Sequence, residues 1–261
     1  MLHRADPDGL LVIAQPAHAW VSGQLARAWG NARFGPVAPW EEVCLGAEQH
    51  DLGHAAWEAA PTLNPATGRP YSFLELPLEE HLRLWSTAGP LALAQGRYAA
   101  LLVSLHGTGL YERRDLAALP AEQVAAVRAF LGRERAFQEG LAASLRRDPR
   151  YAAHATGAAL DRNRRLVAAW DALSLALCHG LRGRRTIGPV PTREAETVLA
   201  LEPGGGSDEV VVSPWPFGRE RVDLVVEARR LPGTFASEAA MRAALASAPW
   251  VNLGTVLRPG D

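Results

Sequence analysis

The segment EQHDLGHAAWE, residues 48–58, holds two histidines and an aspartate within five positions: His50, Asp51 and His54. The apolar residues beside them indicate a helix over residues 39–60 that buries one face. A polar side chain that turns into such a face must find a partner, because an unpaired buried polar group costs free energy. Neighbouring residues of a helix point about 100° apart. One metal ion can therefore contact both His50 and Asp51 only if it lies in the wedge between them.

Other residues of the same types lie in apolar helical segments. Asp171 lies in LVAAWDALSLALC, which is apolar on nearly every side. An isolated buried carboxylate would become neutral, so Asp171 needs a cation or several hydrogen-bond donors. A metal ion and an arginine such as Arg164 or Arg165 are both open as that partner. The histidines with apolar helical neighbours are His18, His81 and His106.

Composition excludes several functional classes. A net charge of −1 favours neither nucleic acid nor an anionic membrane as a partner, and no apolar run approaches the length of a membrane span. All 27 basic residues are arginine, which excludes lysine Schiff-base chemistry and the P-loop motif. Two cysteines, Cys44 and Cys178, are too few for a disulfide framework and predict buried thiols in a cytoplasmic protein. A homodimer stays open.

The pattern along the chain predicts a mainly α protein with a C-terminal α+β extension. Residues 1–185 are expected to form the helical domain and residues 186–261 a small antiparallel sheet with one helix. The apolar strand expected at 9–14 could pair with that sheet. The expected helices cover residues 16–30, 39–60, 78–95, 97–106, 120–147, 151–181 and 237–248, and the expected C-terminal strands cover 195–203, 207–214, 220–229 and 251–257.

The ordered histidines and aspartates resemble the H…HD…H…H…D signature of the HD-domain superfamily, whose members are helical metal-dependent phosphohydrolases, with di-iron oxygenases among their relatives. Within it the chain resembles the DUF3891 family, through QPAHAWVSGQLARAWG, HDLGHAAWE, LLVSLHGTGLYERRD, WDALSLALC and PWPF. The resemblance implies an HD-like helical bundle. It also implies two metal ions, of iron, manganese, zinc or nickel, held by His18, His50, Asp51, His81, His106 and Asp171.

The implied reaction is hydrolysis of a small phosphorylated molecule, for instance a nucleotide-like phosphoester, by a metal-activated water. Asp51 would bridge the two ions. His54 occupies the lysine position of the HD-x-G-K pattern found in one subgroup, and it is either a general acid, a supporting group or exposed. Two other readings stay open: a di-iron oxygenase that uses the same ligands, and a regulatory protein whose metal is only structural.

Candidate substrate contacts lie near this set. Arg113 and Arg114 follow His106 closely, and their planar guanidinium groups suit phosphate or carboxylate, although both could simply balance nearby acidic residues. Tyr111 and Trp57 could form walls of a pocket, or belong to the core. The long loop at 61–77 lies between ligand-bearing segments and could cover the site.

Overall fold

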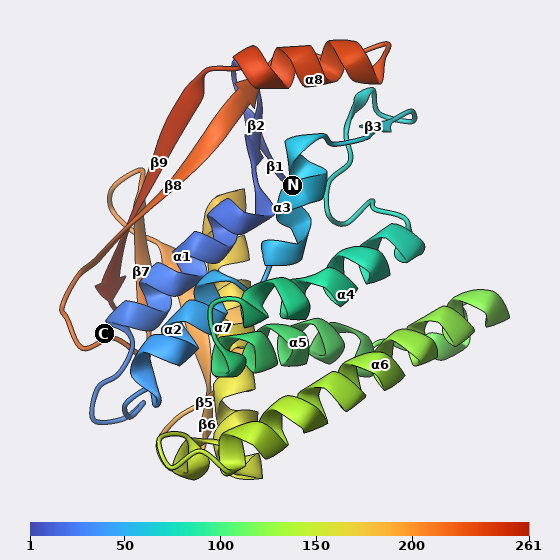
Figure 1. The fold of residues 1–261 in the computed structure, drawn as a ribbon. Helices are drawn as coiled ribbons and strands as arrows, with labels where there is room; N and C mark the ends of the chain where they lie inside the picture. The colour runs from blue at the N-terminus through green and yellow to red at the C-terminus, as the bar shows by residue number, and fades with distance from the viewer. Residues whose placement is uncertain (261) are drawn as a thin grey trace.

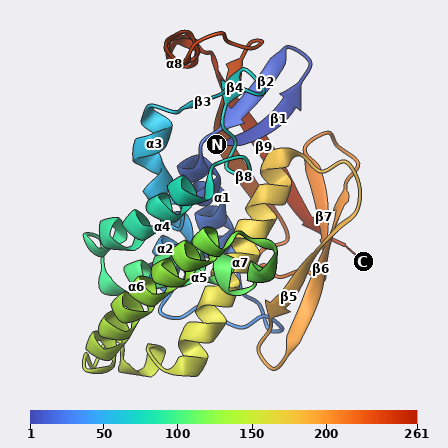
Figure 2. The ribbon, with the colours of Figure 1, turned by 90° about the vertical axis from the view of Figure 1, so that its right-hand side faces the viewer.

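The computed structural model describes residues 1–260 and combines a curled seven-stranded sheet with a layer of helices on one side of it (Figures 1 and 2). The strand order is β1-β2-β8-β9-β7-β6-β5, and all neighbours are antiparallel except β7 and β9. The strands are β1 (Leu2–Asp6), β2 (Gly9–Ile13), β5 (Arg185–Pro191), β6 (Glu196–Pro203), β7 (Glu209–Ser213), β8 (Val222–Leu231) and β9 (Trp250–Pro259), with a separate pair β3 (Leu63–Asn64) and β4 (Arg69–Pro70).

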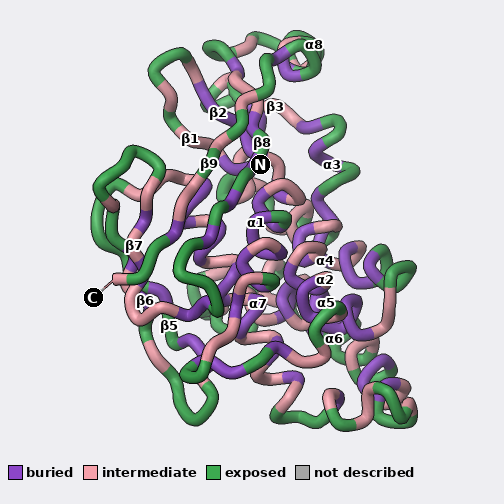
Figure 3. Tube along the Cα trace, turned by 90° about the vertical axis from the view of Figure 1, so that its left-hand side faces the viewer, coloured by how far each residue is buried: buried purple, intermediate pink, exposed green. Residues whose placement is uncertain are grey.

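Two helices connect the sheet to the other helices. Helix α1 contacts β8, and α7 contacts β5 and β1, while α2 and α5 pack against α7 on its other side. Figure 3 shows that α1, α2, α5 and α7 carry the most continuous buried stretches. The helices are α1 (Gln15–Ala28), α2 (Trp40–Glu48), α3 (Ala55–Ala59), α4 (Leu78–Leu93), α5 (Arg97–Glu112), α6 (Ala121–Arg146), α7 (Gly157–His179) and α8 (Glu238–Ser247), with short 3₁₀ turns at Leu52–His54, Leu116–Ala118 and Ala152–His154.

The predicted fold class, a mainly α HD-like helical bundle with a small sheet, is wrong. Strands make up 22% and helices 49% of the protein, and the sheet is a curled half-barrel that dominates one side. Strands β1 and β5 are absent from the prediction, because LHRAD is mostly polar and RTIGPVP contains two prolines. The first two strands also join the C-terminal strands directly, through the pairing of β2 with β8.

Helix α5 is longer than its predicted bounds, 97–106. It continues beyond residue 106 through Gly107 and Gly109 to Glu112. A Cβ atom at Gly107 would lie 2.7 Å from the ring of Trp85 on α4. This glycine therefore allows α4 and α5 to pack closely rather than breaking the helix. Cys44 and Cys178 are buried free thiols, and none of the helices within residues 1–260 is long and apolar enough to cross a membrane.

The segment 39–60 is not one continuous helix, as its pattern predicted. Helix α2 ends at Glu48, residues Gln49–Asp51 form a turn, and a 3₁₀ turn then leads into α3. The 3₁₀ turn contains Gly53 and is packed tightly on α4, because a Cβ atom at Gly53 would lie 2.2 Å from the carbonyl oxygen of Leu84. His50 and Asp51 therefore occupy a bend whose position depends on a glycine two residues later.

Replacing Gly53 by alanine should lower the free energy of unfolding by about 1–3 kcal/mol, the usual cost of adding atoms where none fit. Gly132→Ala on α6 is the matched control, because a Cβ atom there meets nothing within 4 Å. That control should be neutral or more stable by up to about 1 kcal/mol. Denaturant unfolding of both variants checks this, and equal stabilities would contradict the packing described for the turn.

Candidate metal centre

Five of the six predicted metal ligands meet in one buried cluster. They come from four parts of the chain: α1, the turn after α2, α5 and α7. The cluster contains two groups whose donor atoms all lie within 4.8 Å of one another, and the groups share His50. The first consists of His18, His50 and Asp51, and the second of His50, His106 and Asp171.

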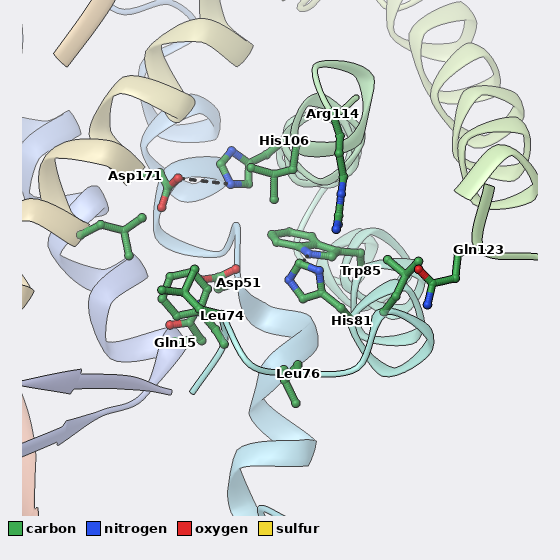
Figure 4. Close-up of a pocket in the computed structure, with 14 residues that line it drawn as sticks. Gln15, Asp51, Leu74, Leu76, His81, Trp85, His106, Arg114, Gln123 and Asp171 are labelled. Atoms are coloured by element: carbon green, nitrogen blue, oxygen red, sulfur yellow. Dashed lines mark hydrogen bonds and ion pairs between the residues drawn. The ribbon is translucent and has the colours of Figure 1, made fainter. Parts of the chain in front are cut away.

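Both carboxylates face the same two imidazoles. His18 Nε2 lies 2.6 Å from an oxygen of Asp51 and 3.8 Å from one of Asp171. His50 Nε2 lies 3.5 Å and 3.4 Å from the same two carboxylates. His106 Nε2 lies 3.8 Å from the second oxygen of Asp171 (Figure 4). The side chain of Asp171 is 15% exposed, and those of the other four residues are almost fully covered.

Hydrogen bonds outside the cluster direct these imidazoles inward. His50 Nδ1 donates to the carbonyl oxygen of Ala47, so Nε2 is the nitrogen that could bind an ion once it gives up its proton, and that atom has no hydrogen-bond partner within residues 1–260. His18 Nδ1 lies 2.7 Å from the hydroxyl of Ser174, which donates to the carbonyl of Asp171 and accepts from Ser22. Ser174 therefore accepts from His18 as well. Metal-binding histidines are commonly oriented in this way.

The charges of the cluster are tightly coupled. Burial opposes the charged form of His50, but the carboxylates of Asp51 and Asp171 outweigh it and raise the pKa of His50 to about 9. Burial also opposes ionisation of Asp51, yet the neighbouring histidines hold its pKa far below the usual range. Burial lowers the pKa of His106 to about 4, so this ring is neutral at neutral pH. The carboxylates thus favour a positive charge beside them, and His50 supplies it by holding a proton.

A divalent ion suits this donor set. Imidazole and carboxylate donors bind iron, manganese, zinc and nickel at about 2.0–2.2 Å, which separates neighbouring donors by about 3.0–3.5 Å. The contacts of His50 with both carboxylates, 3.4 and 3.5 Å, agree with that spacing. An ion would also replace the protons now needed between imidazole and carboxylate, so its binding would release protons.

His81 and His54 lie beside the cluster and not within it. The indole N–H of Trp85 donates to His81 Nε2, and His81 Nδ1 bonds the hydroxyl of Tyr111. His81 therefore has no free lone pair toward an ion in this arrangement. His54 is 1% exposed, and its Nδ1 lies 3.5 Å from Asp51. His54 is not among the residues that line the adjoining cavity, so it contacts Asp51 from the protein side.

A cavity of about 460 Å³ opens onto the cluster. Figure 4 shows Asp51, His106 and Asp171 on its inner side, with His81 and Trp85 on the wall and Arg114 and Gln123 further out. The remaining lining residues are Gln15, Phe73, Leu74, Leu76, Leu78, Leu110 and Leu175. Three of the candidate ligands, Asp51, His106 and Asp171, are therefore reachable by a small molecule.

The predicted substrate residues separate into two groups. Arg114 lines the cavity, and Tyr111 supports it indirectly by bonding His81. Arg113 donates to the carbonyl of Gly109 and lies outside this cavity. Trp57 is a core residue beside Leu84 and does not line the cavity either.

The arginine alternative for Asp171 is not realised within residues 1–260. Arg164 pairs with Glu112 and Asp161, and Arg165 pairs with Asp161 and Glu196. The ion-pair partners of Asp171 in the described chain are instead the three histidines of the cluster. This leaves the two carboxylates without a permanent counter-charge.

Sequence analysis missed Gln15 and the apolar stretch 73–78. Gln15 precedes His18 by three residues and so shares its helix face, which is the signal that could have identified it. Its side chain is 3% exposed, and its Oε1 has no hydrogen-bond partner within residues 1–260. Leu74 and Leu76 belong to the loop 61–77 that was expected to cover the site, and both line the cavity.

The molecule thus combines a curled mixed sheet with a histidine–aspartate cluster in the helices that cover the sheet. A family model described as "Protein of unknown function (DUF3891)" matches residues 1–233, so the chain belongs to the DUF3891 family. The match includes every residue of the cluster and ends after β8. No curated protein and no solved structure shows a significant match to the chain.

Replacing Ser174 by alanine should weaken divalent-metal binding about 10–100-fold, because it removes the hydrogen bond that orients His18. Ser247→Ala on α8 is the control, since its hydroxyl bonds only carbonyls of its own helix. Metal titration followed by calorimetry measures both affinities. Equal affinities in the two variants would show that His18 does not bind the ion.

Proposed function

We propose that this protein is a metal-dependent phosphohydrolase whose catalytic ion or ions bind at the histidine–aspartate cluster. The observation that carries the proposal is the opening of that cluster, through Asp51, His106 and Asp171, onto a cavity large enough for a small substrate. The order of the cluster residues along the chain, which resembles that of the HD-domain superfamily, supports the same reaction class. Within residues 1–260 the sheet supplies no comparable set of ligands.

The residues that would hold the first ion are His18, His50 and Asp51. His106 and Asp171 would hold a second, and His81 would complete that site by exchanging the Trp85 hydrogen bond for the ion. Bound divalent ions supply two things to phosphoester hydrolysis: a lower pKa for a water molecule and neutralisation of phosphoryl charge. His50 offers a single free nitrogen, so it can serve only one of the two ions.

The chain's own groups perform the remaining tasks. The carboxylates of Asp51 and Asp171 face the cavity and can accept the proton that the attacking water loses. The amide side chain of Gln15 lines the same cavity and can orient that water by a hydrogen bond. In the reaction the water oxygen bonds to phosphorus, the bond from phosphorus to the organic oxygen breaks, and a proton passes to the departing alcohol. Arg114 stabilises the phosphoryl group from the cavity wall.

The direct test is hydrolysis of p-nitrophenyl phosphate and bis(p-nitrophenyl) phosphate by protein loaded separately with manganese, iron, zinc or nickel. Asp171→Asn should lower kcat/KM at least about 100-fold, because even groups one contact removed from a metal commonly cost 10–100-fold. Asp161→Asn, a half-exposed aspartate on the same helix that lies outside the cavity, should leave the rate unchanged.

Two results would contradict the proposal. One is hydrolysis that survives in Asp171→Asn at the rate of the Asp161→Asn control. The other is the absence of hydrolysis with every metal although the metal binds. Iron-dependent consumption of oxygen without phosphoester hydrolysis would assign the cluster to an oxygenase instead.

A further inference from the structure

We infer that the substrate is a phosphomonoester of a compact apolar alcohol, and not a nucleotide. This inference rests on the proposed function and concerns the same cavity. Its basis is the chemistry of the cavity wall beyond the metal ligands, which is strongly apolar and has only one cationic side chain.

The apolar part of the wall is extensive and partly exposed. Leu74 is 76% exposed, more than any other large hydrophobic residue described as exposed, and it borders the cavity beside the metal cluster. A leucine left in water at the edge of a binding cavity gains free energy when an apolar ligand covers it. The apolar residues of the wall are Phe73, Leu74, Leu76, Leu78, Trp85, Leu110 and Leu175.

The charge of the wall limits the number of anionic groups. Arg114 is the single arginine that lines this cavity, and the chain has no lysine. Figure 4 shows its guanidinium directed toward Trp85 and His81, and its side chain has no hydrogen-bond or ion-pair partner within residues 1–260. One arginine together with the metal site suits one phosphoryl group, whereas a polyphosphate chain would need further cations along its length.

The polar groups of the wall are too few for a ribose and a base. Apart from the ligand residues, His81 and Arg114, the lining offers only the amides of Gln15 and Gln123. A nucleoside enclosed by leucines would leave several hydroxyl and base groups without partners, which lowers affinity. An aromatic or branched aliphatic group has no polar atoms that need hydrogen-bond partners from the wall.

Equilibrium binding to manganese-loaded protein tests this inference independently of turnover. The probes are three non-hydrolysable phosphonates: 1-naphthyl phosphonate, methylphosphonate and the 5′-methylenephosphonate of adenosine. The naphthyl compound should bind at least about tenfold more tightly than either of the others, since filling an apolar pocket commonly gives discrimination of this size.

Substitutions in the cavity wall test whether its residues cause the preference for the naphthyl compound. Leu74→Ser should weaken binding of naphthyl phosphonate about tenfold and leave methylphosphonate unchanged. Arg114→Gln should weaken both compounds by a similar factor, about tenfold or more, because it removes a charge-assisted contact to the shared phosphoryl group. Arg113→Gln, which lies outside the cavity, should change neither.

The outcomes separate this inference from the proposed function. Equal or tighter binding of the adenosine compound, no binding of any phosphonate, or no effect of Leu74→Ser would overturn the inference even if the protein hydrolyses p-nitrophenyl phosphate. The expected binding pattern without hydrolysis of any phosphoester would support the ligand class and overturn the hydrolase.

Discussion

Two carboxylates, Asp51 and Asp171, face the same pair of imidazoles in a nearly closed volume. Like charges in such a place repel strongly unless a cation lies between them. Within residues 1–260 no arginine forms an ion pair with either carboxylate, and Arg164 and Arg165 pair with other acids. The histidines can supply charge only by holding protons. A bound metal ion would neutralise the two carboxylates more completely than histidine protons do. The proposed function therefore depends on this cluster.

The architecture keeps these groups together. Helices α1 and α7 carry His18 and Asp171 and are the helices that lie against the sheet, while α5 brings His106 and the bend after α2 brings His50 and Asp51. The seven strands join both ends of the chain, because β2 pairs with β8. The sheet therefore supports the two helices that carry these candidate ligands, and the cavity opens between α4, α5 and the loop before α4.

Local sequence patterns indicate part of this structure and not the rest. Periodicity locates α6 closely, because a long amphipathic run with a proline at its start has few alternatives. It did not locate β1 or β5, because the polar residues of β1 and the two prolines of β5 obscure the strand pattern, although each pairs with the next strand along the chain. Apolar surroundings indicated which histidines and aspartates are buried. They could not indicate that Trp85 donates to His81, or that Leu74 borders the cavity, because both depend on how helices and loops pack.

The most direct measurement is anomalous X-ray scattering from crystals of the protein grown with manganese or zinc. We expect a metal peak about 2.0–2.3 Å from Nε2 of His18 and of His50 and from an oxygen of Asp51. If His106 and Asp171 hold a second ion, a second peak lies beside them. No peak at the cluster in metal-soaked crystals, with His18 and Asp51 still in direct contact, would contradict the account, because the carboxylates would then be neutralised by protons alone.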